Sequence, residues 1–279
     1  MEVVRHTFGP CAEWAISVEC RSPGSASSGR VWTLQSPSGE EASSKTDDLG
    51  LEVWPAGKCL CSFLAHHPLI VKHFPNVIEL GGGTGLVGIL ASLLLKATDP
   101  GCVVLTDHDP KVLEVLQRNV DANAACATVQ ELEWRRCSDF QPKQSFRLCL
   151  AADVLYASGV VEALANTVAH VLHPDGAFLG CHSIRRTISI DPTTRLPVLD
   201  NDDAPFRAFQ AALSARGFQW QMLHDSADRH TGNAGAGHGA GPSTREAGNA
   251  GSDEAPLVLM AAARNAAALA TLTGCQQGS

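Results

Sequence analysis

The chain has 279 residues, and 44% of them are hydrophobic, which suffices for one large domain with a buried core or for two small ones. Its net charge of -8 argues against a nucleic-acid partner, because gripping a phosphate backbone calls for a basic patch. An acidic chain is better suited to a cationic substrate.

Two strand-like runs, 13–20 and 31–35, lie within the first 50 residues and flank a loop rich in Ser, Gly and Pro. They predict an N-terminal β-hairpin followed by a connector. The N-terminus lacks the pattern of a signal peptide, no apolar run has membrane-spanning length, and the ten cysteines form no CxxC pair. We therefore expect a soluble intracellular protein with reduced thiols, cytoplasmic and with the nucleus as a second location.

Strands and helices alternate regularly from residue 77 onward. A helical stretch is expected before that, after Gly57, and further helices are expected at 86–95, 111–125 and 160–172, the last stopped by the turn residues 173–176. Short apolar strands are expected at 77–80, 102–106, 128–132, 146–152 and 177–181. This alternation predicts a parallel sheet covered by helices on both faces.

The end of the chain departs from that alternation. A helix at 205–216 leads to a strand at 218–223, and a second strand returns at 256–261 after a Gly-, Ala-, Ser- and Asn-rich insertion at 226–254 that we expect to be disordered. Two strands with no helix between them are most simply antiparallel. The sequence predicts an α/β Rossmann-like sheet of seven strands, mostly parallel with an antiparallel last strand. Its expected domain is 51–265, preceded by hairpin and connector at 1–50 and followed by a frayed tail at 266–279.

A glycine-rich loop, Glu79-Leu80-Gly81-Gly82-Gly83-Thr84-Gly85, joins the first of these strands to a helix. Glycines in such a turn let a ligand approach the backbone N–H groups closely. The stretch Gly83 to Gly88 matches the dinucleotide pattern GxGxxG, whereas Glu79 to Gly85 matches the ExGxGxG pattern of methyltransferases. The loop alone therefore leaves NAD and S-adenosylmethionine both open.

Asp107 stands at the end of the next strand, where a carboxylate can accept hydrogen bonds from both hydroxyls of a ribose. The alternative is a helix cap, a role better suited to Asp109 because it directly precedes Pro110. Both cofactors carry a ribose, so Asp107 does not separate them. The expected antiparallel pair of last strands favours S-adenosylmethionine over NAD, because the sheets of typical dinucleotide-binding domains are parallel to the end. We also find no region that would form the second domain that a dehydrogenase needs.

Several segments together resemble the seven-β-strand methyltransferases of methyltransferase family sixteen, which are mainly protein-lysine methyltransferases. The resemblance covers roughly 50–225 plus the last strand. Its most specific features are Trp54, Trp134 and the Asp-x-x-Tyr motif from Asp153 to Tyr156. The matching stretches are 53–56, 78–88, 105–107, 132–134 and 151–156.

The resemblance implies S-adenosyl-L-methionine as the cofactor. The backbone at Gly81, Gly82 and Gly83 would wrap its methionine part. Glu79 would brace the loop and the cofactor's amino group, and Asp107 would hold the ribose.

The resemblance also implies which residues surround the cofactor and which line the substrate entrance. Trp134 would pack near the adenine, Trp54 would close the cofactor cleft, and Ala152 would lie against the cofactor. Asp153 and Tyr156 would line the substrate entrance as the catalytic pair, with Asp153 aiming the amine rather than acting as a strong base.

The implied function is methylation of a lysine side chain in a protein substrate by a monomer with no nucleic-acid, membrane or metal partner. The alternatives are an NAD(P)-binding oxidoreductase, a non-catalytic adaptor, and a methyltransferase acting on histidine or on a non-protein substrate. After the fifth strand, where many relatives place an acidic residue before an arginine, this chain reads His182-Ser183-Ile184-Arg185-Arg186. We interpret the pairs Arg135-Arg136 and Arg185-Arg186 as solvated surface rather than as a phosphate site. The alternative for Arg185 or Arg186 is contact with an acidic patch on a protein substrate.

Overall fold

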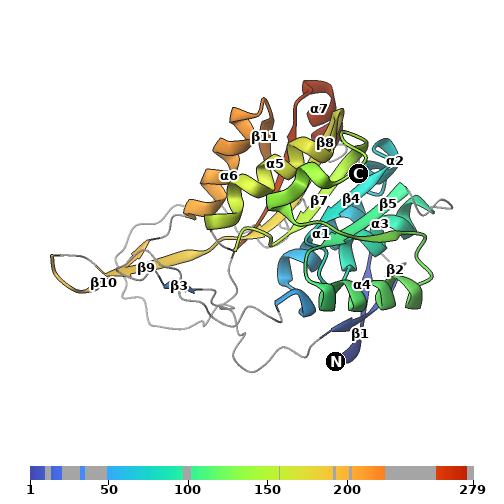
Figure 1. Ribbon diagram of the computed structural model, residues 1–279, viewed down its shortest axis with the longest axis horizontal. Coiled ribbons are helices and arrows are strands. Elements are labelled where there is room, and N and C mark those ends of the chain that lie inside the picture. The colour runs from blue at the N-terminus through green and yellow to red at the C-terminus, as the bar shows by residue number, and fades with distance from the viewer. Residues whose placement is uncertain are drawn as a thin grey trace, which may run out of the picture.

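A seven-stranded sheet of order β11-β12-β8-β7-β4-β5-β6 forms the centre of the computed structural model (Figure 1). The structure describes residues 1–9, 14–20, 32–34, 49–96, 102–156, 158–190, 193–200, 203–223 and 256–274. The predicted insertion at 226–254 lies outside them. The strands of the sheet are β4 (Val77–Leu80), β5 (Val103–Asp107), β6 (Thr128–Glu131), β7 (Phe146–Ala152), β8 (Leu172–Ser183), β11 (Gln219–Leu223) and β12 (Leu257–Ala263).

The strand directions confirm the predicted Rossmann-like sheet. Strands β6, β5, β4, β7 and β8 are parallel to one another, and β12 is antiparallel to both of its neighbours, β8 and β11. The reversed strand is therefore inserted between the fifth and sixth strands of the sheet in chain order rather than added at its edge. This is the arrangement expected of a methyltransferase sheet.

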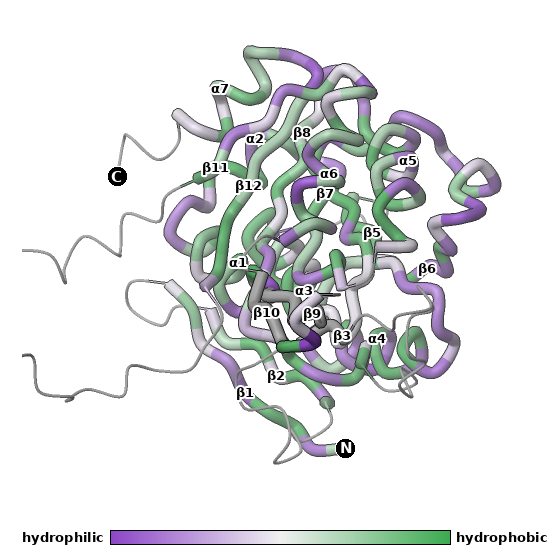
Figure 2. Tube along the Cα trace, turned by 90° about the vertical axis from the view of Figure 1, so that its left-hand side faces the viewer, coloured by the Kyte–Doolittle hydropathy of each residue, from purple (hydrophilic) through white to green (hydrophobic). Residues whose placement is uncertain are grey.

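Helices cover both faces of the sheet, as the alternating pattern predicts. Helices α1 (Pro55–His66), α2 (Leu69–His73), α3 (Leu86–Leu95), α4 (Pro110–Ala122) and α7 (Ala266–Gly274) pack on one face. Helices α5 (Val161–Val171) and α6 (Ala204–Ala215) cover the other, with the 3-10 helix η3 (Trp134–Asp139) (Figure 1). Successive residues of β4 serve opposite faces, which is why all four are buried and three of them, Val77, Ile78 and Leu80, are apolar. In Figure 2 the tube is green through most of these inner strands and helices.

The N-terminal hairpin is present, but its strands differ from those expected. Strand β2 (Trp14–Cys20) pairs antiparallel with β1 (Glu2–Phe8), and not with the run at 31–35. That run contains β3 (Trp32–Leu34), which pairs in parallel with β9 (Arg186–Ile190); β9 also pairs with β10 (Pro197–Asp200). The pattern at 2–8 was overlooked because it lacks a buried face: the burial of β1 alternates only between exposed and half-buried.

Two further expectations were wrong. The tail after residue 265 contains α7, whose Ala268 and Leu272 are buried, so it does not fray at once. The fifth strand begins earlier than predicted, because β8 starts at Leu172. Its register against β7 shifts so that Leu172 pairs with Phe146 and Ala177 with Leu148, and the expected turn at 173–176 is an irregularity within the strand.

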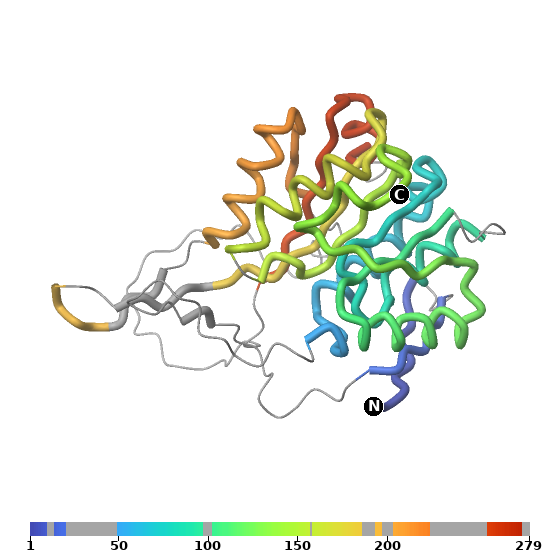
Figure 3. Tube along the Cα trace, viewed as in Figure 1, coloured from blue at the N-terminus to red at the C-terminus, as the bar shows by residue number. Residues whose placement is uncertain are grey.

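Two asparagines, Asn119 in α4 and Asn123 at its C-terminal cap, join the hairpin to the domain. Asn123 exchanges hydrogen bonds with the backbone of Ser17, at 2.9 Å and 2.6 Å. Asn119 accepts from the N–H of Glu19 at 2.6 Å and donates to its carbonyl at 3.1 Å. The Asn119 amide also donates to the carbonyl of Thr84 at 2.9 Å, so one buried side chain joins the hairpin to the glycine loop. Figure 3 shows the hairpin in blue and α7 in red at opposite ends of the molecule.

Replacing Asn119 by alanine is expected to lower the free energy of unfolding by about 2–4 kcal/mol, because backbone groups of Glu19 and Thr84 lose their buried partner. Urea denaturation measures the change. Gln117→Ala, on the exposed face of the same helix, is the control and should shift stability by less than about 0.5 kcal/mol. Equal effects of the two substitutions would contradict the assigned role.

Candidate functional site

The carboxyl ends of the parallel strands bring most of the predicted site residues to one edge of the sheet. The register places Leu80 beside both Thr106 and Ala151, and Ala152 beside Cys181. The glycine loop, Asp107, Asp153 and the end of β8 therefore follow one another along this edge. Ligands of open α/β sheets bind at this edge, where the chain reverses its direction of strand addition. Here the reversal lies at β4, between β5 and β7.

The glycine loop is bound closely to the neighbouring strand. The N–H of Gly82 donates to the carbonyl of Thr106 at 2.8 Å, and the N–H of Gly83 donates to Asp107 Oδ2 at 3.1 Å. Gly83 has φ +54°, and a Cβ there would lie 2.9 Å from the carbonyl oxygen of Gly50. The positive φ and the nearby carbonyl oxygen both exclude a side chain at this position, so the backbone of the loop is exposed to a ligand without a side chain over it.

Glu79 braces the loop from below. Its side chain is buried, and Oε2 accepts the N–H of Gly88 in α3 at 2.9 Å. Burial raises the pKa of Glu79 to about 8; the Gly88 hydrogen bond opposes this shift and the charge of Asp107 adds to it. The predicted contact with the cofactor's amino group stays a prediction.

Asp107 stays ionised although it is buried. Burial raises its pKa, but hydrogen bonds from the His108 side chain and from the N–H groups of Asp109, Gly83 and His108 outweigh that effect and hold the pKa below its usual value. The alternative role as a helix cap belongs to Asp109, whose Oδ1 accepts the N–H of Lys111 at 2.8 Å. The Asp107 carboxylate thus ends at the loop and not at α4.

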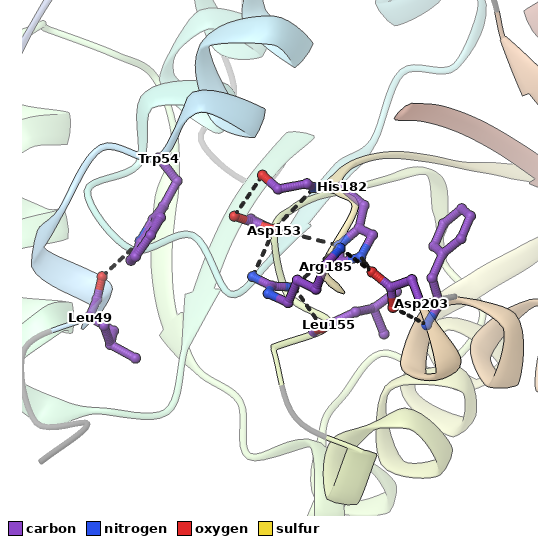
Figure 4. Close-up of polar contacts among 9 residues, drawn as sticks. Leu49, Trp54, Asp153, Leu155, His182, Arg185 and Asp203 are labelled. Carbon is purple, nitrogen blue, oxygen red and sulfur yellow. Dashed lines mark hydrogen bonds and ion pairs between the residues drawn. The ribbon is translucent and has the colours of Figure 1, made fainter. Parts of the chain in front are cut away.

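The two predicted tryptophans lie on segments beside the loop. Trp54 directly precedes α1, and its Nε1 donates to the carbonyl of Leu49 at 3.1 Å, in the 3-10 helix η1 (Leu49–Leu51) (Figure 4). Trp134 begins η3, and a Cβ at Gly81 would lie 3.3 Å from its Cζ2. Trp134 is therefore in reach of the loop itself, whereas Trp54 is linked to it through η1.

Asp153 directs its carboxylate inward. Its backbone is left-handed, with φ +56°, a conformation that aspartate tolerates better than most residues. Oδ1 accepts from the N–H of Ser183 at 3.2 Å and from Arg185 Nη2 at 3.0 Å, and Oδ2 accepts from the Ser183 hydroxyl at 3.1 Å (Figure 4). The side chain is only 2% exposed. Among the described residues, Oδ2 is the oxygen with an acceptor position to spare.

Arg185 is not solvated surface, and that expectation was wrong. It is buried, and besides its bond to Asp153 its Nη1 donates to the carbonyl of Leu155 at 2.7 Å. Burial raises the pKa of Asp153, but a hydrogen bond from His182 and the charge of Arg185 outweigh it, so the net shift is downward. The buried arginine therefore keeps the carboxylate charged.

Tyr156 is 42% exposed and lies apart from the Asp153 network. Burial raises its pKa, the charges of Asp107 and Glu133 raise it further, and Arg135 opposes them. No hydrogen bond joins Tyr156 to Asp153 within the part of the chain that the structure describes. The tyrosine thus lies in the field of Asp107, whereas the aspartate faces Ser183. Their predicted joint role as a catalytic pair stays a prediction.

Ala152 is the last residue of β7, half-buried and in register with Cys181 of β8. It occupies the predicted place between the strand ends. Its predicted contact with the cofactor is a statement about a bound state and stays a prediction.

Sequence reasoning assigns no role in the site to Gly50, His182, Ser183 or Asp203. His182 and Ser183 directly follow the strand expected at 177–181 and so belong at the same edge, a signal that could have found them. Asp203 lies far from that strand in the chain, and no pattern marks it. Gly50 stood at the assumed end of the connector, where no pattern marked it.

The chain is similar in sequence to several methyltransferases. It is 38% identical to the protein N-lysine methyltransferase METTL21A of Danio rerio, over 46% of this chain and 57% of that one. It is 39% identical to the protein-lysine methyltransferase METTL21E of Mus musculus, over 45% and 52%, and 34% identical to the protein-lysine N-methyltransferase EFM6 of Saccharomyces cerevisiae, over 44% and 58%. It thus spans a little over half the length of these curated relatives.

The sheet with its reversed strand and the loop joined to Asp107 define a Rossmann-like methyltransferase fold. The lysine methyltransferase family matches residues 40–192, more than half of the chain. The chain belongs to this family, which confirms the resemblance. Among solved structures it is similar to the glycopeptide N-methyltransferase MtfA complexed with sinefungin, at 15% identity over 75% of this chain and 94% of that one, with a TM-score of 0.46.

The raised pKa of Glu79 predicts a pH-dependent stability. A carboxyl group with a folded pKa above its unfolded value stabilises the fold below the unfolded pKa and loses that contribution as pH rises through the folded pKa. Relative to Glu79→Gln, the wild-type chain should therefore lose about 2–4 kcal/mol of unfolding free energy between pH 5 and 9. Denaturation curves across this range measure the difference.

The control is Glu114→Gln, which changes an exposed carboxylate on α4. Its stability should follow the wild-type pH dependence. If the stability of the wild type and of Glu79→Gln depended on pH in the same way, the raised pKa of the buried Glu79 would be contradicted.

Proposed function

We propose that the chain is a protein-lysine methyltransferase that uses S-adenosyl-L-methionine. The observation that carries the proposal is the bond between the Gly83 N–H and the ionised Asp107, at the edge of a sheet with a reversed strand. This joins a side-chain-free loop to a carboxylate that can accept ribose hydroxyls. Membership in the lysine methyltransferase family supports the choice of chemistry.

The residues present fit the proposed cofactor. A Cβ at Gly81 would lie 3.0 Å from Val154 Cγ1 and 3.3 Å from Trp134 Cζ2, so glycine keeps open a space bounded by an aliphatic and an aromatic side chain. Gly81, Gly82 and Gly83 would hold the methionine part, Asp107 the ribose, and Trp134 the adenine. When bound, S-adenosyl-L-methionine supplies a methyl group on a good leaving group, the sulfonium sulfur.

The remaining work of the chain is to bind the cationic amine of the substrate and to align it for attack once it has lost a proton. An ammonium group must lose its proton before its nitrogen attacks, and a carboxylate with a lowered pKa is a poor base for that step. We therefore assign Asp153 to holding the amine through Oδ2, and Tyr156 to orienting it by its hydroxyl or ring face. The proton leaves to water.

The rival functions have less support. The reversed strand β12 is foreign to an all-parallel dinucleotide domain, and the family is one of lysine methyltransferases. The proposed substrate is a lysine side chain of a protein. We also propose that the enzyme is a monomer and acts in the cytoplasm. Among the helices that the structure describes, none has both the length and the apolar character to cross a membrane.

The cofactor role of Asp107 is tested by Asp107→Ala. Loss of a hydrogen-bonded charge should weaken binding of S-adenosylhomocysteine by about 1–3 kcal/mol in titration calorimetry. Asp109→Ala is the matched control, since this neighbouring carboxylate caps α4 and should leave the affinity unchanged. Unaltered binding by Asp107→Ala would refute the ribose role. Tighter binding of NAD than of S-adenosylhomocysteine by the wild-type chain would refute the cofactor.

The activity is tested with radiolabelled S-adenosylmethionine and an extract of cells that lack this protein. Wild-type chain should label protein substrates on lysine, and Asp153→Asn should reduce the rate by about 100-fold while S-adenosylhomocysteine still binds, because the amine loses its aligned partner. Mass spectrometry identifies the modified residue. Undiminished labelling by Asp153→Asn would sink the role of Asp153, and label on histidine or on non-protein material would overturn the substrate class.

A further inference from the structure

The imidazole of His182 lies between two buried carboxylates. Its Nε2 is 2.8 Å from Oδ2 of Asp203, the residue that caps α6, and its Nδ1 is 3.5 Å from Oδ1 of Asp153 (Figure 4). Asp203 also accepts the N–H of Arg185 at 2.7 Å and the N–H of Phe206 at 3.0 Å. One histidine thus connects the proposed amine-holding carboxylate of β7 to the start of α6, although the two lie fifty residues apart in the chain.

The two ring nitrogens have different partners. The short contact to Asp203 assigns a proton to Nε2, which donates to the carboxylate. Nδ1 also lies 3.5 Å from Arg185 Nη1, so in the neutral ring its lone pair meets a guanidinium donor. In the protonated ring Nδ1 carries a hydrogen that points at Asp153 Oδ1. Protonation therefore replaces an arginine contact with a contact to the carboxylate.

Protonation also changes the charge of the network. Asp153 and Asp203 are negative and Arg185 is positive, so the group carries one net negative charge with neutral His182 and none with protonated His182. The four residues are all at most 8% exposed. A single charge counts for much more in such an environment than at a solvated surface.

We propose that His182, fixed by Asp203, is a positioning residue for Asp153 and that its protonation weakens the binding of a cationic amine at the substrate entrance. The proposal rests on the proposed function, because it takes Asp153 to hold the amine. It adds a pH-dependent control of substrate affinity that comes from residues outside the Asp-x-x-Tyr motif.

The surroundings of His182 raise its pKa above the ordinary value of a histidine. Burial and the charge of Arg185 lower its pKa, but hydrogen bonds with Asp153 and Asp203 outweigh them, and the net shift is upward. Among the described residues, these three are the charged groups that face the ring: Asp153 directly after β7, Asp203 at the start of α6 and Arg185 in the same segment as His182. The partner of His182 in β12 is Val258. The ring of Phe206 stacks on the imidazole at 5.1 Å, beside an apolar cavity lined by Leu155 and Phe178.

The thiols of Cys59 and Cys181 lie next to the network, and Cys181 directly precedes His182. Their mutual hydrogen bond and the burial of Cys181 raise the pKa of its thiol. Both effects keep Cys181 neutral, so it adds no charge that could compete with His182 in the pH range of interest.

The test uses the full chain saturated with S-adenosylhomocysteine and titrated with n-butylamine, an analogue of the lysine side chain that stays cationic because its pKa resembles the 10.4 of lysine. Histidine-ring NMR reads both the binding and the titration of His182, whose signal is absent from His182→Gln. Between pH 6 and 8.5 the wild-type affinity should rise about tenfold, since the network gains a net negative charge. His182→Gln, which can still donate to Asp203, should change less than about twofold.

His170→Gln is the control, since His170 is a half-buried histidine of α5 whose Nε2 contacts the carbonyl of Phe140; this variant should follow the wild type. Thermal unfolding supplies a second measurement. The raised pKa of His182 makes its contribution to stability largest at low pH and lost as pH rises through that pKa, opposite to the trend in affinity. A purely structural histidine would change stability and leave the affinity trend in place.

An affinity trend in His182→Gln equal to that of the wild type would overturn the proposal, as would undetectable n-butylamine binding by the wild type at pH 8.5. Failure of S-adenosylhomocysteine to bind the wild-type chain is a different result. It would refute the proposed function through the glycine loop, which His182 does not touch.

Discussion

The buried hydrogen bond between Glu79 and Gly88 sets how closely α3 approaches the central strand. Glu79 lies on β4 and Gly88 lies in the first turn of α3, with the glycine loop between them. A Cβ at Gly88 would lie 2.6 Å from the Glu79 carboxylate and 2.6 Å from Leu105, so any side chain there would push the helix away from the sheet. Because both ends of the loop are fixed by this bond, its backbone can present N–H groups rather than collapse onto the core.

Three carboxylates along the same sheet edge differ in charge because they differ in the number of donors around them. Glu79 has one backbone N–H and a raised pKa, so it is mostly neutral near pH 7. Asp107 and Asp153 are also buried, but several hydrogen bonds, and for Asp153 an arginine, lower their pKa values. The edge thus combines a neutral brace with two anions. This distribution suits the proposed site, where Asp107 would bind a ribose and Asp153 a cationic amine, while a neutral Glu79 avoids an unpaired buried charge beneath the loop.

Much of the fold could be predicted from local patterns. The strands and helices from 51 to 223 were found because their apolar residues repeat with the period of each element, and the reversed strand was found because no helix separates the last two strands. The pairing of β2 with β1 could not be predicted, because the hydrogen bonds between them are ones that any two neighbouring strands can form. The attachment of the hairpin by Asn119 and Asn123 depends on amides one helical turn apart, which a pattern of apolar residues does not reveal.

The glycine loop and Asp107 could be predicted from the sequence, whereas the buried charge of Arg185 could not. Glycines and strand-end carboxylates mark the loop and Asp107 because backbone geometry demands them. The burial of Arg185 could not be inferred, since an arginine in a polar stretch looks like surface until a carboxylate from another strand is known to face it.

The network behind Asp153 also explains how the chain can bury polar residues at the end of β8 and directly after it. Arg185 brings a positive charge into the interior, and a buried charge without compensation is costly. Asp153 supplies one partner and Asp203 the other, the latter from the start of α6 on the face of the sheet where α5 also packs. Since Asp203 also caps α6, the helix cannot shift without disturbing His182 and, through it, the carboxylate of Asp153 at the proposed substrate entrance. The geometry of the proposed substrate side is therefore set by the packing of α6, whereas that of the cofactor side is set by the Glu79 bond to α3.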